Sequence, residues 1–474
     1  MAHRKVVLCL LGAALATSMI SGCSGKKSDP VTVTVWTYYN GDQLDAFNDL
    51  TEKFNDTVGK KDGITVETKS LGTAEDLEQN VLAAVNGEVG ASEVPNIFSA
   101  YSDTAYTMDQ KDMLVDLSDY LTDKEKDEYV EEYLKEGDFS DDGSIKIFPV
   151  AKSTELLFLN DTDWQKFAKE TGAQYEDLQT VEGLVETAEK YYNWTDSQTP
   201  EADDGKALFG RDAMANYLLV GAKELGCDIF GVKDGKMTLN FDEDIIRKLW
   251  DNYYVPYVKG YFSAFGRFRS DDVKTGNVLG YVGSTSSATF FPTQVSDDSG
   301  AAYDIDLKVL PCSKFKDGDD YAVQQGAGMV VTKGSEDEIK ASIEFLKWFT
   351  QSENNIEFSV GSGYLPVTKE ANNIEKIKSV DSDISSSMEE ILTESEAEIN
   401  DNNLYYMHAF ENGNDARTVL QEAFGDTAQQ DRNTVDERIA QGESAEEAEA
   451  EFSSDEYFEQ WYQNVLSKLQ AYEG

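Results

Sequence analysis

Histidine, cysteine and positive charge are all scarce in this sequence of 474 residues. The histidines are His3 and His408, so a mechanism built on a histidine base or a histidine metal cluster has almost no residues to use. The four cysteines show no C-x-x-C spacing, which argues against a zinc knuckle or a redox pair. Whether Cys227 and Cys312 pair with each other stays open at this point. The 41 basic residues face 90 acidic ones, and a net charge of -49 repels phosphate backbones, which argues against nucleic acid as a partner.

Catalytic and nucleotide-binding motifs are missing as well. The sequence contains no GxxxxGK[ST], no GxGxxG after a strand, no HExxH and no GxSxG. FKDGDDY (315–321) has the acids of an EF-hand loop without its spacing. A glycosidase carboxylate pair cannot be recognised among 90 acidic residues, because nearby pairs arise by chance. The sequence therefore implies no enzyme activity, no metal and no cofactor.

Long apolar runs are confined to the N-terminus. Residues 1–22 combine a basic start, an apolar stretch and small residues before Cys23, which is the pattern of a signal peptide. Ile20-Ser21-Gly22-Cys23 resembles the bacterial lipobox, whose cysteine is diacylated. We therefore predict a lipoprotein signal peptide over 1–22, lipidation of Cys23 and a polar tether over 23–30. This arrangement would hold a folded body by a lipid anchor at the extracytoplasmic face of the cell membrane.

The remaining chain alternates strand and helix patterns and has enough apolar residues, 40%, for a sizeable core. VTVTVWTYY (31–39) predicts a strand, residues 41–59 predict an amphipathic helix, and GITVETKSL (63–71) returns to strand. This order is typical of an α/β fold with a parallel sheet. We expect further helices at 75–86, 161–171, 180–192, 211–225, 242–254 and 335–351, and further strands at 94–101, 277–284, 303–311 and 326–333.

Aromatic and small polar residues gather where predicted strands end. Trp36 and Tyr38 follow the first strand, Tyr101 and Asp103 follow the third, and GSTSSATFF (283–291) provides a run of small donors. Apolar sugar faces stack on aromatic rings, while sugar hydroxyls need placed polar partners. Any one of these aromatics could equally pack in the core, and the two phenylalanines that end the last run suit the core best. Their shared placement after strands predicts a site for a carbohydrate or another polyol.

Segments along nearly the whole chain resemble family 1 extracellular solute-binding proteins, the ligand-capturing lipoproteins of ABC importers. They include VTVTVWTYYNGDQLDAFNDLTEKF, VPNIFSAYSDTAYTMDQKDMLVDLSDYL, IFPVAKSTELLFLNDTDW, GAGMVVTKGSEDEIKASIEFLKWFTQSEN and GSGYLPVTKEA. The resemblance implies a two-lobed, type II periplasmic-binding-protein-like fold, with hinged lobes whose central sheets are flanked by helices. It implies a non-enzymatic monomer that delivers its ligand to ABC permease subunits in the membrane. Lobe 1 would span 31–149 with 306–350 returning to it, and lobe 2 would span 150–305 with 351–474 returning.

Within the family, the sequence is similar to the branch of the sn-glycerol-3-phosphate-binding protein and many sugar binders. That similarity implies ligand contacts from Ser153, Ser286, Gly326, Tyr364 and Arg417. LGTAED (71–76) lacks a tyrosine of the phosphoglycerol pattern, and Ser102 separates Tyr101 from Asp103, so we rank a sugar or oligosaccharide ahead of glycerol-3-phosphate and its diesters. A glycan-active enzyme and a surface sensor are the alternatives of another class.

Tyr364 lies in a glycine–proline turn, GSGYLPVT (361–368), which has no structural need for a large aromatic. If the turn borders the ligand, its ring and hydroxyl would contact that ligand. We therefore expect Tyr364→Ala to weaken ligand binding much more than it lowers fold stability.

Overall fold

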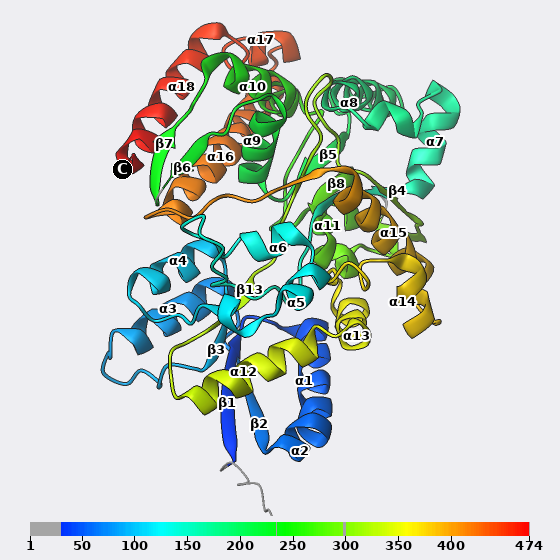
Figure 1. The fold of residues 1–474 in the computed structure, drawn as a ribbon. Coiled ribbons are helices and arrows are strands. Elements are labelled where there is room, and N and C mark those ends of the chain that lie inside the picture. Colours follow the sequence, from blue (N-terminus) through cyan, green and yellow to red (C-terminus); the bar gives the residue numbers. More distant parts are fainter. Residues whose placement is uncertain (1–29, 234, 297–299, 474) are drawn as a thin grey trace, which may run out of the picture.

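The computed structural model describes residues 30–233, 235–296 and 300–473, which form two lobes (Figure 1). Each lobe is built on a four-stranded sheet with helices packed around it. In Figure 1 the lobe that begins the chain lies below, and the C-terminal helices cover the lobe above. The expected signal peptide and Cys23 lie outside the described residues, as does all of the tether except Pro30. In the described ranges, no helix is both long and apolar enough to cross a membrane.

The first sheet has the strand order β13-β3-β1-β2. Its strands are β1 (Val31–Thr37), β2 (Ile64–Ser70), β3 (Ile97–Ala100) and β13 (Gly328–Val331). β1 pairs in parallel with β2 and β3, as the strand–helix–strand pattern predicts, whereas β13 runs antiparallel to β3. The helices of this lobe include α1 (Gly41–Phe54), α3 (Ala74–Val85), α12 (Glu336–Phe349) and α13 (Ser352–Ser362). Their aromatic residues close the core, with the Phe47 ring centroid 5.4 Å from that of Phe349 and 6.3 Å from that of Phe358.

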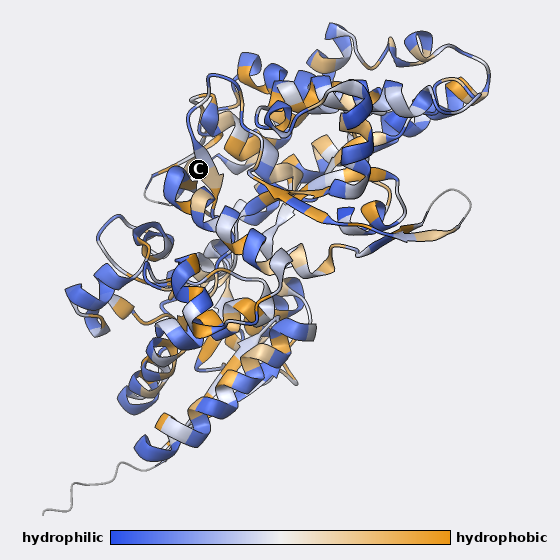
Figure 2. Ribbon diagram, turned by 90° about the vertical axis from the view of Figure 1, so that its right-hand side faces the viewer, coloured by the Kyte–Doolittle hydropathy of each residue, from blue (hydrophilic) through white to orange (hydrophobic). Residues whose placement is uncertain are grey.

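The second sheet has the strand order β11-β4-β8-β5. Its strands are β4 (Glu155–Asn160), β5 (Ala207–Arg211), β8 (Val278–Ser284) and β11 (Leu307–Leu310). The surrounding helices include α8 (Val181–Asp196), α9 (Met214–Glu224), α10 (Glu243–Val258), α16 (Gly413–Ala440) and α18 (Asp455–Leu469). Trp250 anchors their shared core, with ring centroids 3.5 Å from Tyr254 and 4.6 Å from Trp461. Figure 2 shows hydrophobic segments inside both lobes and largely hydrophilic outer helices, which agrees with the acidic composition.

Three chain segments meet in a short ladder between the lobes. Lys152 exchanges backbone hydrogen bonds with Leu365, and Ser153 exchanges them with Gln325. Phe148 on the first-lobe side exchanges them with Met329 of β13. Because all three segments are bonded side by side, they form one connection between the lobes, of the kind that serves as a hinge in two-lobed binding proteins.

The lobe division expected from the sequence differs from the structure at two elements. We assigned 306–350 to lobe 1, but β11 pairs antiparallel with β4 in the second sheet. We assigned 351–474 to lobe 2, but α13 packs on α1, where Phe358 joins the first-lobe core. The pairing partner of a strand and the docking face of a helix are non-local, so an alternating or amphipathic pattern does not encode them. Phe290 also departs from its expected core position, because 66% of its surface is exposed.

The other helices and strands fill in around the two sheets. They are α2 (Lys60–Asp62), α4 (Ser102–Gln110), α5 (Asp123–Glu128), α6 (Glu131–Lys135), α7 (Asp161–Thr171), β6 (Phe230–Lys233), β7 (Lys236–Leu239), α11 (Arg269–Lys274), β9 (Gln294–Ser296), β10 (Ala302–Asp304), β12 (Tyr321–Val323), α14 (Ile374–Val380), α15 (Ser386–Asp401), β14 (Asn403–Tyr405) and α17 (Ala445–Glu449).

Candidate functional site

A cavity of about 440 Å³ lies where the two lobes and the hinge ladder meet. This size is in the usual range for small-molecule sites. Its lining is mostly tyrosine, serine, asparagine and glutamine. The lining residues are Tyr101, Ser102, Asp103, Glu136, Ser153, Asn216, Ser284, Ser286, Val323, Gln324, Gln325, Gly326, Tyr364, Tyr405, Tyr406, Met407, Asn414 and Arg417.

Stacked tyrosines form the first-lobe wall of the cavity. Tyr101 comes directly after β3 and is 42% exposed, with its ring stacked on that of Tyr38 at 6.0 Å between centroids. The Tyr38 hydroxyl lies 3.3 Å from the Tyr364 hydroxyl. The neighbouring Tyr38 hydroxyl and burial together raise the pKa of Tyr101 well above its usual value, and burial raises the pKa of Tyr38 and of Tyr364. All three phenols are therefore neutral near pH 7 and can both donate and accept hydrogen bonds.

Asp103 from the first lobe and Arg417 from the second lobe both line the cavity. Asp103 on α4 is 7% exposed, and its Oδ1 atom has no hydrogen-bond partner among the described residues. Burial raises the pKa of Asp103 to about 7, although Arg417 opposes this shift. A Cβ atom added to Gly413, at the start of α16, would lie 2.7 Å from Asp103 Oδ1. The lobes therefore meet closely at this point, and glycine permits that approach.

The hinge contributes a buried ion pair and a turn that requires glycine. Lys152 is fully buried, and its Nζ donates to Glu136 and, at 2.8 Å, to the carbonyl oxygen of Gly326. Gln324 Nε2 also donates to Glu136, at 2.7 Å. Gly326 has φ +90°, and a Cβ atom there would lie 3.0 Å from the carbonyl oxygen of Ala151. Removing one partner of such a buried pair leaves an uncompensated charge, so losing either Lys152 or Glu136 should destabilise the hinge.

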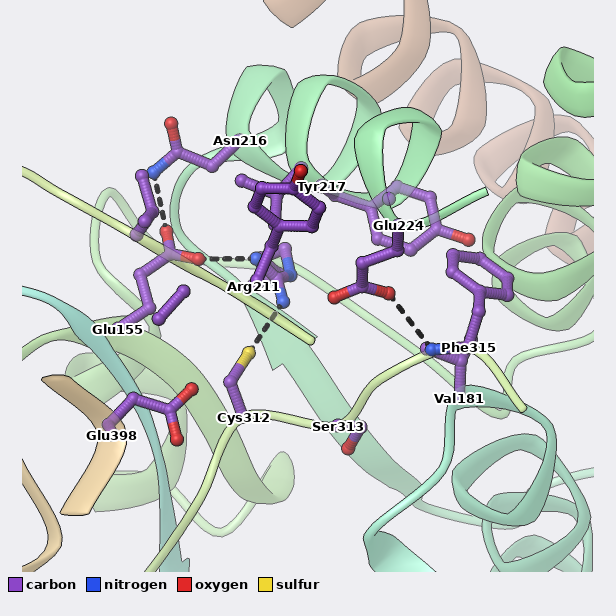
Figure 3. A pocket seen from close by; sticks show the side chains of 15 residues that line it. Glu155, Val181, Arg211, Asn216, Tyr217, Glu224, Cys312, Ser313, Phe315 and Glu398 are labelled. Carbon is purple, nitrogen blue, oxygen red and sulfur yellow. Dashed lines mark hydrogen bonds and ion pairs between the residues drawn. The ribbon is translucent and has the colours of Figure 1, made fainter. Parts of the chain in front are cut away.

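A hydrogen-bonded chain of side chains leads from Arg417 into the second lobe. Arg417 Nη2 donates to Asn216 Oδ1 at 2.7 Å, and Asn216 Nδ2 donates to Glu155 Oε1 at 2.7 Å. Arg211 Nη1 donates to Glu155 Oε2 at 2.6 Å, and Arg211 Nη2 donates to Cys312 Sγ at 3.1 Å. Figure 3 shows the three contacts among Asn216, Glu155, Arg211 and Cys312 around a buried space of about 30 Å³, about one water molecule in size. Cys312 and Cys227 are both free thiols in the structure.

The structure brings seven of the nine predicted ligand residues together around this cavity. They are Tyr101, Asp103, Ser153, Ser286, Gly326, Tyr364 and Arg417. Tyr38 lies behind Tyr101 and supports it without lining the cavity. Trp36 is 6% exposed and packs in the first-lobe core, with Lys69 Nζ 4.9 Å above its ring. That these seven residues touch a ligand stays a prediction.

Sequence reasoning missed several residues of the lining. Glu136 belongs to an acidic helical segment whose pattern is that of a solvated surface, so only its buried lysine partner distinguishes it. Asn216 lies on α9 among apolar neighbours and carries no motif. Tyr405 and Tyr406 form an aromatic pair next to Met407 in the non-helical segment 402–412, and that pair was the one signal that could have identified them.

Comparisons with known proteins agree with this architecture. The sequence profile of a family described as bacterial extracellular solute-binding protein matches residues 49–383, which is most of the chain. The chain belongs to this family. The resemblance stated from the sequence is thereby confirmed, and the members of this family are binding proteins rather than enzymes. Curated proteins, by contrast, include no significant match to the sequence.

Solved structures similar to this solute-binding protein span nearly its full length. The cyclic α-maltosyl-1,6-maltose binding protein from Arthrobacter globiformis has a TM-score of 0.65 at 17% identity, covering 93% of this chain and 100% of that chain. UgpB from Mycobacterium tuberculosis, in complex with glycerophosphocholine, has a TM-score of 0.64 at 19% identity, covering 94% and 98%. Maltose-bound MalE3 from T. maritima has a TM-score of 0.61 at 14% identity, covering 92% and 100%. The predicted two-lobed α/β fold is therefore confirmed.

Proposed function

We propose that this solute-binding protein captures a neutral sugar or short oligosaccharide in the interlobe cavity and delivers it to an ABC permease. The observation that carries this proposal is the lining itself. Neutral tyrosines and small polar groups from both lobes surround a space of about 440 Å³. The tyrosine rings offer faces for sugar rings, and the serine, asparagine and glutamine groups match alternating hydroxyl donors and acceptors.

The charges of the lining also favour a neutral ligand. Glu136 is already paired with Lys152, and Asp103 with its pKa of about 7 faces the same cavity as Arg417. A phosphate bound at Arg417 would share the cavity with both carboxyl groups. A guanidinium can instead serve a sugar as a fork of hydrogen-bond donors.

A glycerophosphodiester is the second candidate, and Arg417 is the observation that favours it. Asn216 is its only hydrogen-bond partner in the described part of the chain, and no carboxylate lies within 4.0 Å of it there. Its remaining donors are therefore available to an anion. The complex of the similar protein UgpB with glycerophosphocholine supports keeping this candidate.

Titration calorimetry of the purified protein separates the candidates. We expect saturable binding of a neutral sugar such as maltotriose and little response to glycerol-3-phosphate or glycerophosphocholine. Binding of glycerophosphocholine with no response to any neutral sugar would establish the second candidate instead. Release of reducing ends from a glycan would indicate an enzyme, which the family membership argues against.

The membrane attachment is part of the proposal. An extracellular family places the folded body outside the cytoplasm. We infer that Cys23 carries the lipid anchor and that the protein acts as a monomer beside its permease. Loss of membrane attachment in Cys23→Ser, with unchanged sugar binding, is the expected result.

A further inference from the structure

We propose that Glu155 supports ligand affinity at this site without touching the ligand, by fixing the amide orientation of Asn216 and so holding Arg417 toward the cavity. The proposal rests on the proposed function, because it assigns a role within the same site. Glu155 is 4% exposed, on the first residue of β4, and is absent from the cavity lining, whereas Asn216 and Arg417 line the cavity. Glu155 is therefore a positioning residue.

The direction of each hydrogen bond determines how the amide of Asn216 is oriented. Glu155 as a carboxylate can only accept, and both of its oxygens do so, one from Arg211 Nη1 and one from Asn216 Nδ2. Arg417 can only donate. Asn216 lies between an acceptor and a donor, so its amide has one satisfied orientation, with Nδ2 toward Glu155 and Oδ1 toward Arg417. This is the orientation in the structure.

Glutamine at position 155 keeps the size but breaks this polarity. If its oxygen faces Arg211, its NH₂ group faces Asn216, whose amide must then turn and present its own NH₂ group to Arg417. If its oxygen faces Asn216 instead, its NH₂ group faces the guanidinium of Arg211. Either way two donors meet in a buried site. The first case is favoured because the side chain of Arg211 is buried, 8% exposed, whereas Arg417 lines the cavity and can turn its guanidinium into it. In that case Arg417 loses the one side-chain hydrogen-bond partner it has among the described residues.

Glu224 provides a matched control. It is also a buried carboxylate, 6% exposed, around the same small space in Figure 3, and it accepts a hydrogen bond from the Phe315 backbone N–H at 2.9 Å. No hydrogen bond leads from it to Asn216 or Arg417 in the described residues, and a glutamine oxygen can replace its acceptor. Glu224→Gln therefore removes a buried carboxyl group without disturbing the amide of Asn216.

The test is a double-mutant cycle read by titration calorimetry with maltotriose and glycerophosphocholine as probes. The affinity is measured for the probe that wild type binds. Because Arg417 loses a hydrogen bond, Glu155→Gln should lower this affinity about tenfold or more, while Glu224→Gln should change the same affinity less than threefold. In an Arg417→Met background, Glu155→Gln should cause no further loss. An equal loss from Glu155→Gln with and without Arg417, or wild-type affinity in Glu155→Gln, would overturn the proposal.

Crystal structures of the two glutamine variants keep the test independent of the probe. We expect the guanidinium of Arg417 to leave Asn216 in Glu155→Gln and to keep it in Glu224→Gln. If wild type binds neither probe, the proposed ligand classes fail, while the position of Arg417 in these two structures still decides the role of Glu155. An Arg417–Asn216 bond retained in Glu155→Gln would refute it.

Discussion

Replacing Tyr101 and Tyr364 separately by alanine should separate ligand binding from fold stability. The Tyr364 ring is 5% exposed and packs 6.2 Å from Phe358 and 6.0 Å from Tyr39 between centroids. Truncating a buried aromatic of this kind costs about 3–5 kcal/mol of unfolding free energy. Tyr101 is 42% exposed and stacks on Tyr38, so its truncation costs about 0.5–1.5 kcal/mol of stability.

The effects on binding should run in the opposite order. Tyr101 presents the most exposed ring of the cavity wall, and losing such an anchor weakens binding by about 2 kcal/mol, or roughly thirtyfold. Tyr364→Phe isolates the cavity-side hydroxyl while keeping the packed ring, and we expect it to lower affinity with little change in stability. The expectation from the sequence that Tyr364→Ala acts mainly on binding is therefore revised by the burial of its ring.

Urea denaturation and titration calorimetry on the same samples measure both quantities. The reasoning is refuted if Tyr101→Ala stays folded and binds sugar within twofold of wild type. It is equally refuted if Tyr364→Ala leaves the unfolding midpoint unchanged.

Three further changes test the acidic residue of the cavity, the contact between the lobes and the lipid anchor. Burial raises the pKa of Asp103 to about 7, so ionising its carboxyl group in the folded protein costs about 4 kcal/mol. The contribution of Asp103 to stability therefore falls as pH rises from about 4 to 7 and stays low above 7. Asp103→Asn should therefore raise the melting temperature relative to wild type more at pH 8 than at pH 4; an equal gain at both would contradict this. Gly413→Ala places a methyl group 2.7 Å from Asp103 Oδ1, so it should weaken ligand binding and increase the separation of the two lobes measured by small-angle scattering. Gly425→Ala is the control, because its methyl group meets only the flexible Met214 side chain, at 3.3 Å, and it should change neither quantity. Cys23→Ser should move the protein from the membrane fraction to the medium, and continued membrane association would exclude the lipid anchor.

The sequence predicted local structure well because local patterns determine it. The first strand, the helix that follows it from Gly41 and the helix expected at 335–351 all occur, the last as α12, which begins with a capping box of Ser335 and Glu338. Trp36 is a residue for which the local pattern is not sufficient. Helices cover both faces of the first sheet, so Val35, Trp36 and Thr37 are all buried and alternation does not separate core from site.

The sheet membership of β11 and the burial of Glu136 could not be predicted from the sequence, for a different reason. β11 has an ordinary strand pattern, and only its pairing with β4 places it in the second lobe. Glu136 is one of 90 acidic residues, and its partner Lys152 lies 16 positions away in the hinge. Such contacts depend on how distant segments dock, which composition and periodicity leave open.

The central claim is that the interlobe cavity binds a neutral sugar, and calorimetric titration of wild type and Tyr101→Ala with a panel of neutral sugars tests it most directly. The account predicts one saturable site for at least one sugar in wild type, with roughly thirtyfold weaker binding in Tyr101→Ala and unchanged binding in Glu224→Gln. A sugar that binds wild type and Tyr101→Ala equally, or no binding of any neutral sugar at all, would contradict it.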